Sequence, residues 1–346
     1  MKKKSILLAV LAIALIAASV VGIVSCGKVS EGEYVIVAPD GAPALAVSGL
    51  AGSSFYYAEG VSVRAEVVAA SEIGTRAAKA DIAIVPANVA AKLFNEGSDI
   101  KVVATVTHGN LYMVGMPDAP AVTDLTQLEG KIVASIGKGS VPDSLFKAML
   151  TKAGVEYVVA EDPAKAVATE GKVTLIYGAD GAAVIPQVVT GKASYGIIGE
   201  PAVSTAAKSK GLQEKADMQA LWNEANGSEG GYSQAVLIMK SSLAKDVSFT
   251  TSLLSQLQAN ADKIVSSDEY ARQAVSNIKT VYESTSLKPE NMTASIIKRS
   301  NVKIVSADTQ EGLAEITAML EAVLNVNPQS IGGKVPAQNS GFYFTV

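Results

Sequence analysis

The loop from Gly137 to Asp143 carries residue types suited to binding a small anion. It reads Gly-Lys-Gly-Ser-Val-Pro-Asp and leads into a helical pattern. Backbone N–H groups and the Ser140 hydroxyl would therefore face a ligand at a helix N-terminus. Alternatively, Ser140 or Asp143 is a plain helix cap. Nucleotide binding is not supported, because Ile132 stands where a P-loop needs its first glycine and Pro142 where a dinucleotide fingerprint needs its last.

Other candidate ligand contacts lie where predicted strands end. Glu200 could accept a hydrogen bond from a ligand amine or ring N–H, or act only as an acidic residue at a helix N-terminus. Asn88 is either a helix cap or a ligand contact, and Tyr177 could stack on a flat ligand. The full set is Asp40, Gly41, Ala42, Pro43, Pro86, Ala87, Asn88, His108, Gly139, Ser140, Tyr177, Gly178, Glu200 and Pro201.

The chain offers little for catalysis or metal binding. His108 is its only histidine, and it could contact a ligand or simply occupy a turn. One histidine without clustered acids or thiols does not make a zinc site. Serine-hydrolase, zinc-protease and serine-lysine motifs are absent from the sequence. We therefore expect no catalytic residue, no metal and no cofactor.

Cys26 is the only cysteine and follows an apolar N-terminal stretch that begins after Lys2, Lys3 and Lys4. This is the layout of a secretory signal, and residues 23–26 resemble the lipobox of bacterial lipoproteins, which implies lipidation of Cys26. We expect a signal peptide at 1–25 and a tether at 26–33. The alternative is an uncleaved membrane anchor. Both place the remaining chain outside the cytoplasm.

The composition indicates an exported globular protein of two lobes. A chain of 346 residues exceeds what one hydrophobic core usually organises. Its 33 acidic residues outnumber 29 basic ones, so nothing suggests nucleic-acid binding. With one cysteine, no internal disulfide can form, and stability must come from burial of the 49% hydrophobic residues.

Short Val/Ile-rich runs alternate with Ala-rich amphipathic stretches from Tyr34 onward, which predicts an α/β fold with mostly parallel sheets flanked by helices. In such sheets, ligands bind beyond the carboxyl ends of the strands. The predicted strands are 34–37, 63–68, 81–85, 131–135, 173–177 and 195–199.

Two extended apolar segments break this alternation and are predicted to cross between the lobes. The first is 100–106 together with 111–115, and the second is 234–239. We therefore assign residues 34–115 and 232–346 to lobe I and residues 116–231 to lobe II. Long helices are expected near 246–266, 268–283 and 309–324, followed by a tail at 328–346 that wraps the surface or is partly disordered.

Together these segments resemble the solute-binding lipoproteins of ABC importers, in the nitrate/taurine/sulfonate group with the type II periplasmic-binding fold. The matching pieces, in order, are 39–44, 80–88, 125–133, 189–193, 199–201 and 331–336. The resemblance implies a monomer, lipid-anchored at the cell surface or in the periplasm, that captures an anionic, zwitterionic or small heterocyclic solute between two lobes. It would deliver that solute to a membrane permease and its ATPase.

Two other classes remain as alternatives. An exported enzyme on the same fold could act on a small cofactor precursor, although such enzymes are normally cytoplasmic. A structural or adhesive lipoprotein is disfavoured by the absence of repeats and low-complexity stalks.

Overall fold

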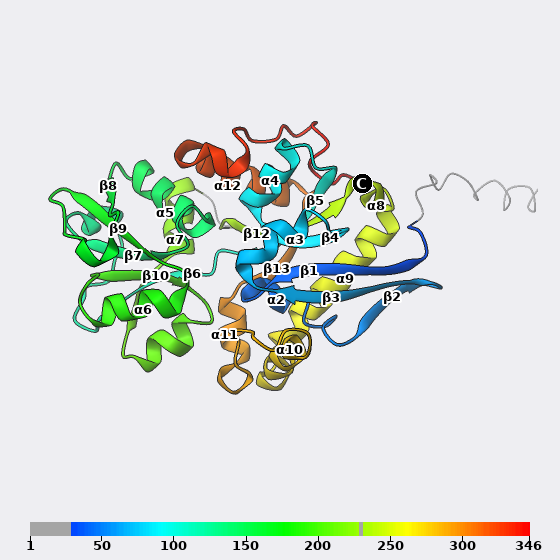
Figure 1. The fold of residues 1–346 in the computed structure, drawn as a ribbon, viewed down its shortest axis with the longest axis horizontal. Coiled ribbons are helices and arrows are strands. Elements are labelled where there is room, and N and C mark those ends of the chain that lie inside the picture. Colours follow the sequence, from blue (N-terminus) through cyan, green and yellow to red (C-terminus); the bar gives the residue numbers. More distant parts are fainter. Residues whose placement is uncertain (1–28, 228–230) are drawn as a thin grey trace, which may run out of the picture.

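The computed structural model describes residues 29–227 and 231–346, which form two lobes, each built on one β-sheet with helices on its faces (Figure 1). The predicted signal peptide, Cys26 and the start of the tether lie outside the described residues. The predicted α/β fold class is confirmed. No helix in the described part of the chain is both long and apolar enough to cross a bilayer.

Lobe I contains a seven-stranded sheet in the order β13-β5-β12-β4-β1-β3-β2. The neighbours of β1 are parallel to it, whereas β12, β13 and β2 run antiparallel to their partners. Its strands are β1 (Gly32–Pro39), β2 (Ser54–Ala58), β3 (Val61–Val68), β4 (Ile82–Pro86), β5 (Ile100–His108), β12 (Ser233–Lys240) and β13 (Val302–Ser306).

The lobe I helices are α2 (Ala42–Ala46), α3 (Ile73–Ala77), α4 (Ala87–Asn95), α8 (Ser241–Ala244), α9 (Val247–Ile264), α10 (Asp268–Val281), α11 (Ala294–Arg299) and α12 (Gln310–Val326). The three long predicted helices correspond to α9, α10 and α12. Their buried positions recur at helical spacing, as in Leu253, Leu254 and Leu257 of α9.

Lobe II contains a six-stranded sheet in the order β11-β6-β10-β7-β9-β8. Strands β10, β7, β9 and β8 are parallel, and β6 is antiparallel to both of its neighbours. The strands are β6 (Leu111–Gly115), β7 (Ile132–Ile136), β8 (Glu156–Val159), β9 (Lys172–Gly178), β10 (Tyr195–Gly199) and β11 (Gln213–Asp217), and the helices are α5 (Val141–Lys152), α6 (Gly181–Val189) and α7 (Met218–Asn226).

The chain passes from lobe I to lobe II at Gly109 and Asn110, between β5 and β6. The sequence analysis placed this crossing after Gly115. In the structure β6 pairs with β10 and β11, so residues 111–115 belong to the sheet of lobe II. The return crossing ends at Tyr232, and the Gly109 N–H donates to the Tyr232 carbonyl at 3.0 Å. A Cβ on Gly109 would lie 2.3 Å from the Tyr232 ring, so this close approach of the two crossings requires glycine.

One hydrophobic cluster of the described residues extends from lobe I into lobe II. Helix α12 of lobe I packs against α5 of lobe II, and both contribute to one buried cluster. In Figure 1, α12 lies on one side of the junction and α11 on the other. The buried contributors are Leu145, Phe146 and Met149 from α5, and Ile316, Met319, Leu320 and Val323 from α12.

The C-terminal tail is ordered and partly buried, so the alternative of partial disorder in the tail is wrong. Phe342, Tyr343 and Phe344 are almost fully buried. Val102 of β5 exchanges backbone hydrogen bonds with Phe342 and Phe344 at 2.7 and 2.8 Å. The tail therefore extends the hydrogen bonding of β5 and closes over the core of lobe I.

Candidate ligand-binding site between the lobes

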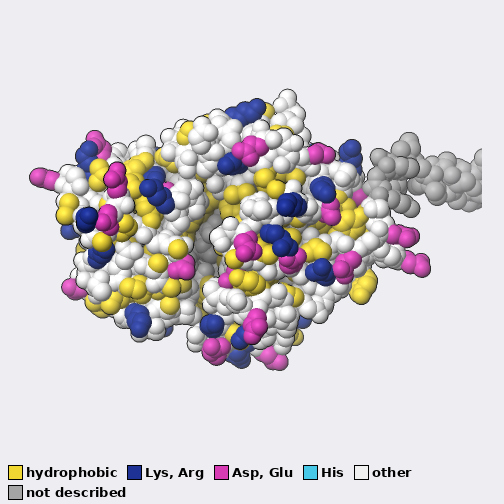
Figure 2. Space-filling view, in the orientation of Figure 1, with side chains coloured by type: hydrophobic (Ala, Val, Ile, Leu, Met, Phe, Trp, Pro, Cys, Tyr) yellow, Lys and Arg dark blue, Asp and Glu magenta, His cyan; other side chains and the backbone are white. Residues whose placement is uncertain are grey.

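The strand registers place the carboxyl ends of the parallel strands at the junction of the lobes. Pro86, the last residue of β4, pairs with Ala235 near the start of β12. Gly199, the last residue of β10, pairs with Leu111 at the start of β6. Because β12 and β6 begin at the crossings, the ends of β4 and β10 must face the junction. Their parallel neighbours end on the same side, and a groove runs between the lobes there (Figure 2).

Three candidate contacts at this junction retain a buried polar atom without a hydrogen-bond partner. They are Asn88 in the first turn of α4, His108 at the end of β5, and Ser140 at the N-terminus of α5. The atoms without partners are Asn88 Oδ1, His108 Nδ1 and Ser140 Oγ. Buried polar atoms are usually paired, and leaving one unpaired costs about 1–3 kcal/mol. These side chains are therefore the strongest candidates for contact with a ligand.

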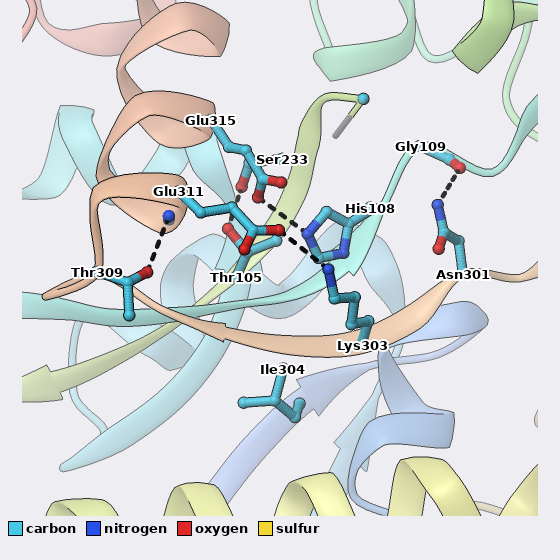
Figure 3. A network of polar contacts seen from close by, with 12 residues as sticks. Thr105, His108, Gly109, Ser233, Asn301, Lys303, Ile304, Thr309, Glu311 and Glu315 are labelled. Carbon is cyan, nitrogen blue, oxygen red and sulfur yellow. Dashed lines mark hydrogen bonds and ion pairs between the residues drawn. The ribbon is translucent and has the colours of Figure 1, made fainter. Parts of the chain in front are cut away.

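His108 belongs to a buried polar group at the crossing (Figure 3). Its Nε2 lies 3.0 Å from Glu315 Oε2, and His108 is only 2% exposed. Figure 3 shows Glu315 reaching from α12 toward the end of β5, beside Thr105 and Ser233, whose hydroxyls lie 2.9 Å apart. The tautomer in which the Nε2–H donates this bond leaves Nδ1 as an acceptor.

The loop predicted to bind an anion already holds a carboxylate of its own. Asp143 accepts hydrogen bonds from the Gly139 N–H at 2.7 Å, from Lys147 at 2.9 Å and from the Tyr177 hydroxyl at 2.6 Å. Burial raises the pKa of Tyr177, and the bond to Asp143 raises it further. Gly139 and the hydroxyl of Tyr177 are thus engaged with Asp143. Ser140, the N-cap residue of α5, makes no side-chain cap bond, and the Asp143 carboxylate instead binds the loop that precedes the helix.

The four predicted contacts in the loop after β1, residues 40–43, differ in which of their groups are available to a ligand. The Asp40 carboxylate accepts bonds from the Thr285 hydroxyl at 2.5 Å and from the Ser286 N–H at 2.8 Å, which ties the loop to the segment after α10. Gly41 has a φ of 101° and faces open space. Ala42 is buried and Pro43 lies in the first turn of α2. This loop can contact a ligand through backbone atoms.

Glu200 is fully engaged inside the protein. Its side chain is 0% exposed and accepts bonds from the Ser204 N–H and hydroxyl and from Arg299 Nε, the last at 2.6 Å. Arg299 also donates from Nη2 to Glu214 at 2.7 Å, and its guanidinium carbon lies 4.0 Å from the centre of the Tyr112 ring. Burial alone would lower the pKa of Arg299, but its bonds to Glu200 and Glu214 raise it.

Sequence reasoning missed Arg299. No arginine is among the predicted contacts, and Arg64 and Arg76 pair with Glu33 and Glu66 within lobe I. Arg299 lies 99 positions from Glu200 along the chain. The only local sign is a Lys-Arg pair at the end of a short helix, and such pairs are common where they complement the helix dipole.

The remaining predicted contacts are backbone or apolar positions at the same junction. Pro86 and Ala87 begin α4, the Gly178 carbonyl accepts from the Gly137 N–H at 3.0 Å, and Pro201 follows Glu200 in a cis peptide bond. Within residues 29–227 and 231–346, no three His, Cys, Asp or Glu side chains gather as a metal site would need.

The family described as NMT1/THI5 like matches residues 52–165, less than half of the chain. A search of curated proteins found no match.

Solved structures match over nearly the whole chain. An ABC transporter from Parabacteroides distasonis is 19% identical, with 90% of this chain and 98% of that chain covered and a TM-score of 0.66. The periplasmic aliphatic sulphonate binding protein SsuA from Escherichia coli is 13% identical, with 88% and 95% covered and a TM-score of 0.61. The alkanesulfonate-binding protein SsuA from Xanthomonas axonopodis pv. citri, bound to MOPS, is 12% identical, with 92% and 100% covered and a TM-score of 0.56. The chain therefore has the fold of these binding proteins, as predicted from its sequence.

Proposed function

We propose that this protein is the extracytoplasmic solute-binding component of an ABC importer, which captures a small solute between its lobes and delivers it to a membrane permease. The observation that carries the proposal is the set of buried, unpartnered polar atoms at facing strand ends. Asn88 and His108 come from lobe I and Ser140 from lobe II. A ligand that bonds to both sides would bridge the lobes.

Such a ligand would stabilise the closed arrangement because it makes its full set of contacts only there. The amide oxygen of Asn88 accepts, Nδ1 of His108 accepts in the tautomer that donates from Nε2, and the Ser140 hydroxyl donates and accepts. A solute with N–H or O–H groups would satisfy all three. Because the chain is similar in fold to sulfonate-binding proteins, the proposed ligands include anions as well as zwitterions and small heterocycles.

A thermal-shift screen tests the proposal. The soluble chain beginning at Gly27 should gain stability with one compound from a panel of anions, sulfonates, amino acids and pyrimidines. At 100 times the dissociation constant the gain is about 2.7 kcal/mol, which raises Tm by roughly 5–11 °C at about 2–4 °C per kcal/mol. A panel without any shift would count against the proposal.

The same experiment separates binding from catalysis. The stabilising compound should be recovered unchanged after prolonged incubation, as analysed by mass spectrometry. Conversion of that compound into a product would favour the alternative of an exported enzyme on this fold.

We further propose that Cys26 is lipidated and anchors a monomeric protein to the cell membrane, with residues 1–25 removed as a signal peptide. The support is the basic head, apolar stretch and lipobox-like residues 23–26. Metabolic labelling with a fatty-acid analogue should mark the wild type and not Cys26→Ala. Equal labelling of both would exclude lipidation at this cysteine.

A further inference from the structure

The ion pairs of the described residues are distributed unequally between the lobes and their junction. Ten ion pairs between a Lys or Arg and an Asp or Glu side chain form within residues 29–227 and 231–346, and only the two made by Arg299 join lobe I to lobe II. Electrostatic attachment of the lobes is thus concentrated on one side chain.

All partners of that side chain belong to lobe II. Glu200 follows β10, Glu214 lies in β11 and Tyr112 lies in β6. The three elements come from separate parts of the sequence and offer two carboxylates and an aromatic face. A planar guanidinium can bind both carboxylates through its fixed fork of N–H donors while it stacks on the ring, a geometry that an ammonium lacks. Lobe II therefore provides a binding site for the Arg299 side chain of lobe I.

The contact lies beside the covalent hinge. The side chain of Asn301, two residues after Arg299, donates to the Gly109 carbonyl at 3.0 Å, and the Asn301 backbone carbonyl accepts from the His108 backbone N–H at 3.0 Å. On the other side, the Glu200 N–H donates to the Asn110 carbonyl at 3.0 Å. Both ends of the ion pair are thus tied to residues 108–110, where the chain crosses between the lobes.

We propose that Arg299, Glu200, Glu214 and Tyr112 form a hinge brace, an ionic link beside the two covalent crossings that limits how far the lobes open. The brace lies beside the crossings about which the lobes would rotate. A small movement at the brace would therefore produce a larger displacement at the far ends of the lobes. Only its consequence for solute affinity rests on the proposed function. Since affinity scales with the fraction of protein in the binding-competent arrangement, a slack hinge would weaken binding without touching the site.

The test measures the distance between the lobes in protein prepared free of bound solute. A chain beginning at Gly27 contains no cysteine, so Lys165→Cys in lobe II and Glu269→Cys in lobe I give a unique pair of exposed spin-label sites. Electron–electron resonance should give one narrow distance distribution for the otherwise unchanged chain. Arg299→Gln should broaden it and add a second population.

Two further variants, a control within lobe I and a change that removes only one of the two ion pairs, test whether the effect is specific to the brace. Arg64→Gln removes an ion pair within lobe I and should leave the distribution narrow. Glu214→Gln removes one of the two links at a partly exposed carboxylate, so it keeps the fold and should broaden the distribution less than Arg299→Gln. Unchanged distributions in both brace variants, or equal broadening in Arg64→Gln, would overturn the brace. Because no solute is added, this result is independent of whether the thermal-shift panel yields a ligand.

Discussion

The two lobes meet on opposite sides of the hinge through contacts of different chemistry. On one side, α12 packs its apolar residues against α5 within a shared core. On the other, Arg299 alone makes the ion pairs that join the lobes among the described residues. Apolar burial is non-directional and is not screened by salt, whereas a guanidinium bound to two carboxylates fixes an orientation. The apolar contact thus holds the lobes together, and the ionic contact fixes their relative orientation.

The apolar side should carry the larger share of stability. Leu320→Ala removes a fully buried side chain of α12 and should lower the free energy of unfolding by about 2–5 kcal/mol. Denaturant unfolding measures this, and the loss should be the same at low and high salt. Glu321→Ala, an exposed change on the same helix, is the control and should cost little. A loss for Leu320→Ala as small as this control would remove α12 as the adhesive contact.

The ionic side should contribute less, and its contribution should depend on salt. Arg299→Gln leaves the Glu200 carboxylate buried without its cation, which should cost about 1–3 kcal/mol. The double variant with Glu200→Gln should recover part of this loss, because no uncompensated charge remains. Strict additivity of the two single changes in unfolding experiments would mean that the residues do not interact.

Substitutions in the site between these contacts should change the affinity for solute and not the stability of the fold. Asn88→Ala removes an unpartnered amide oxygen and should make the binding free energy of the identified solute less favourable by about 0.5–1.5 kcal/mol. The Tm of the solute-free protein should not change. Isothermal titration gives the affinity, and Asn325→Ala on the exposed side of α12 serves as control. If both variants bind like the wild type, Asn88 does not contact the solute.

The smallest effect concerns alkaline pH. Burial raises the pKa of Tyr112 to about 12, so the folded state holds this proton more tightly than the unfolded state. Its stabilising contribution is complete below about pH 10 and falls as pH rises toward 12. Tyr112→Phe should reduce the loss of stability between pH 9 and 11 by about 1 kcal/mol or less. An alkaline loss identical in both proteins would show that Tyr112 does not titrate as expected.

The repeating βα units were predictable because their signal is local. The run Tyr195–Gly199 is β10 itself, and the predicted helix at 268–283 differs from α10 only at its end. Short edge strands such as β8 and β11 were missed, since Gln213–Asp217 carries three charged residues and lacks the apolar run that marks a strand. The crossing at Gly109 was misplaced because β5 and β6 form almost one apolar stretch.

The candidate site was predictable only in position. The rule that ligands bind at strand ends located Asn88, His108, Ser140 and Glu200 at the junction. It could not tell which polar atoms are already engaged, since the partners of Glu200 and Asp40 lie 99 and 245 positions away. Local sequence carries no information about such contacts, and so Arg299 was overlooked.

Mass spectrometry of the protein as purified tests the central claim most directly. Native spectra of the chain beginning at Gly27 should show one small molecule bound per protein, and denaturation should release that molecule intact. The double variant Asn88→Ala/Ser140→Ala should lose it while Arg299→Gln, which leaves the site intact, should retain a reduced share. A molecule held equally by the double variant and the wild type would contradict a solute site between the lobes at these residues.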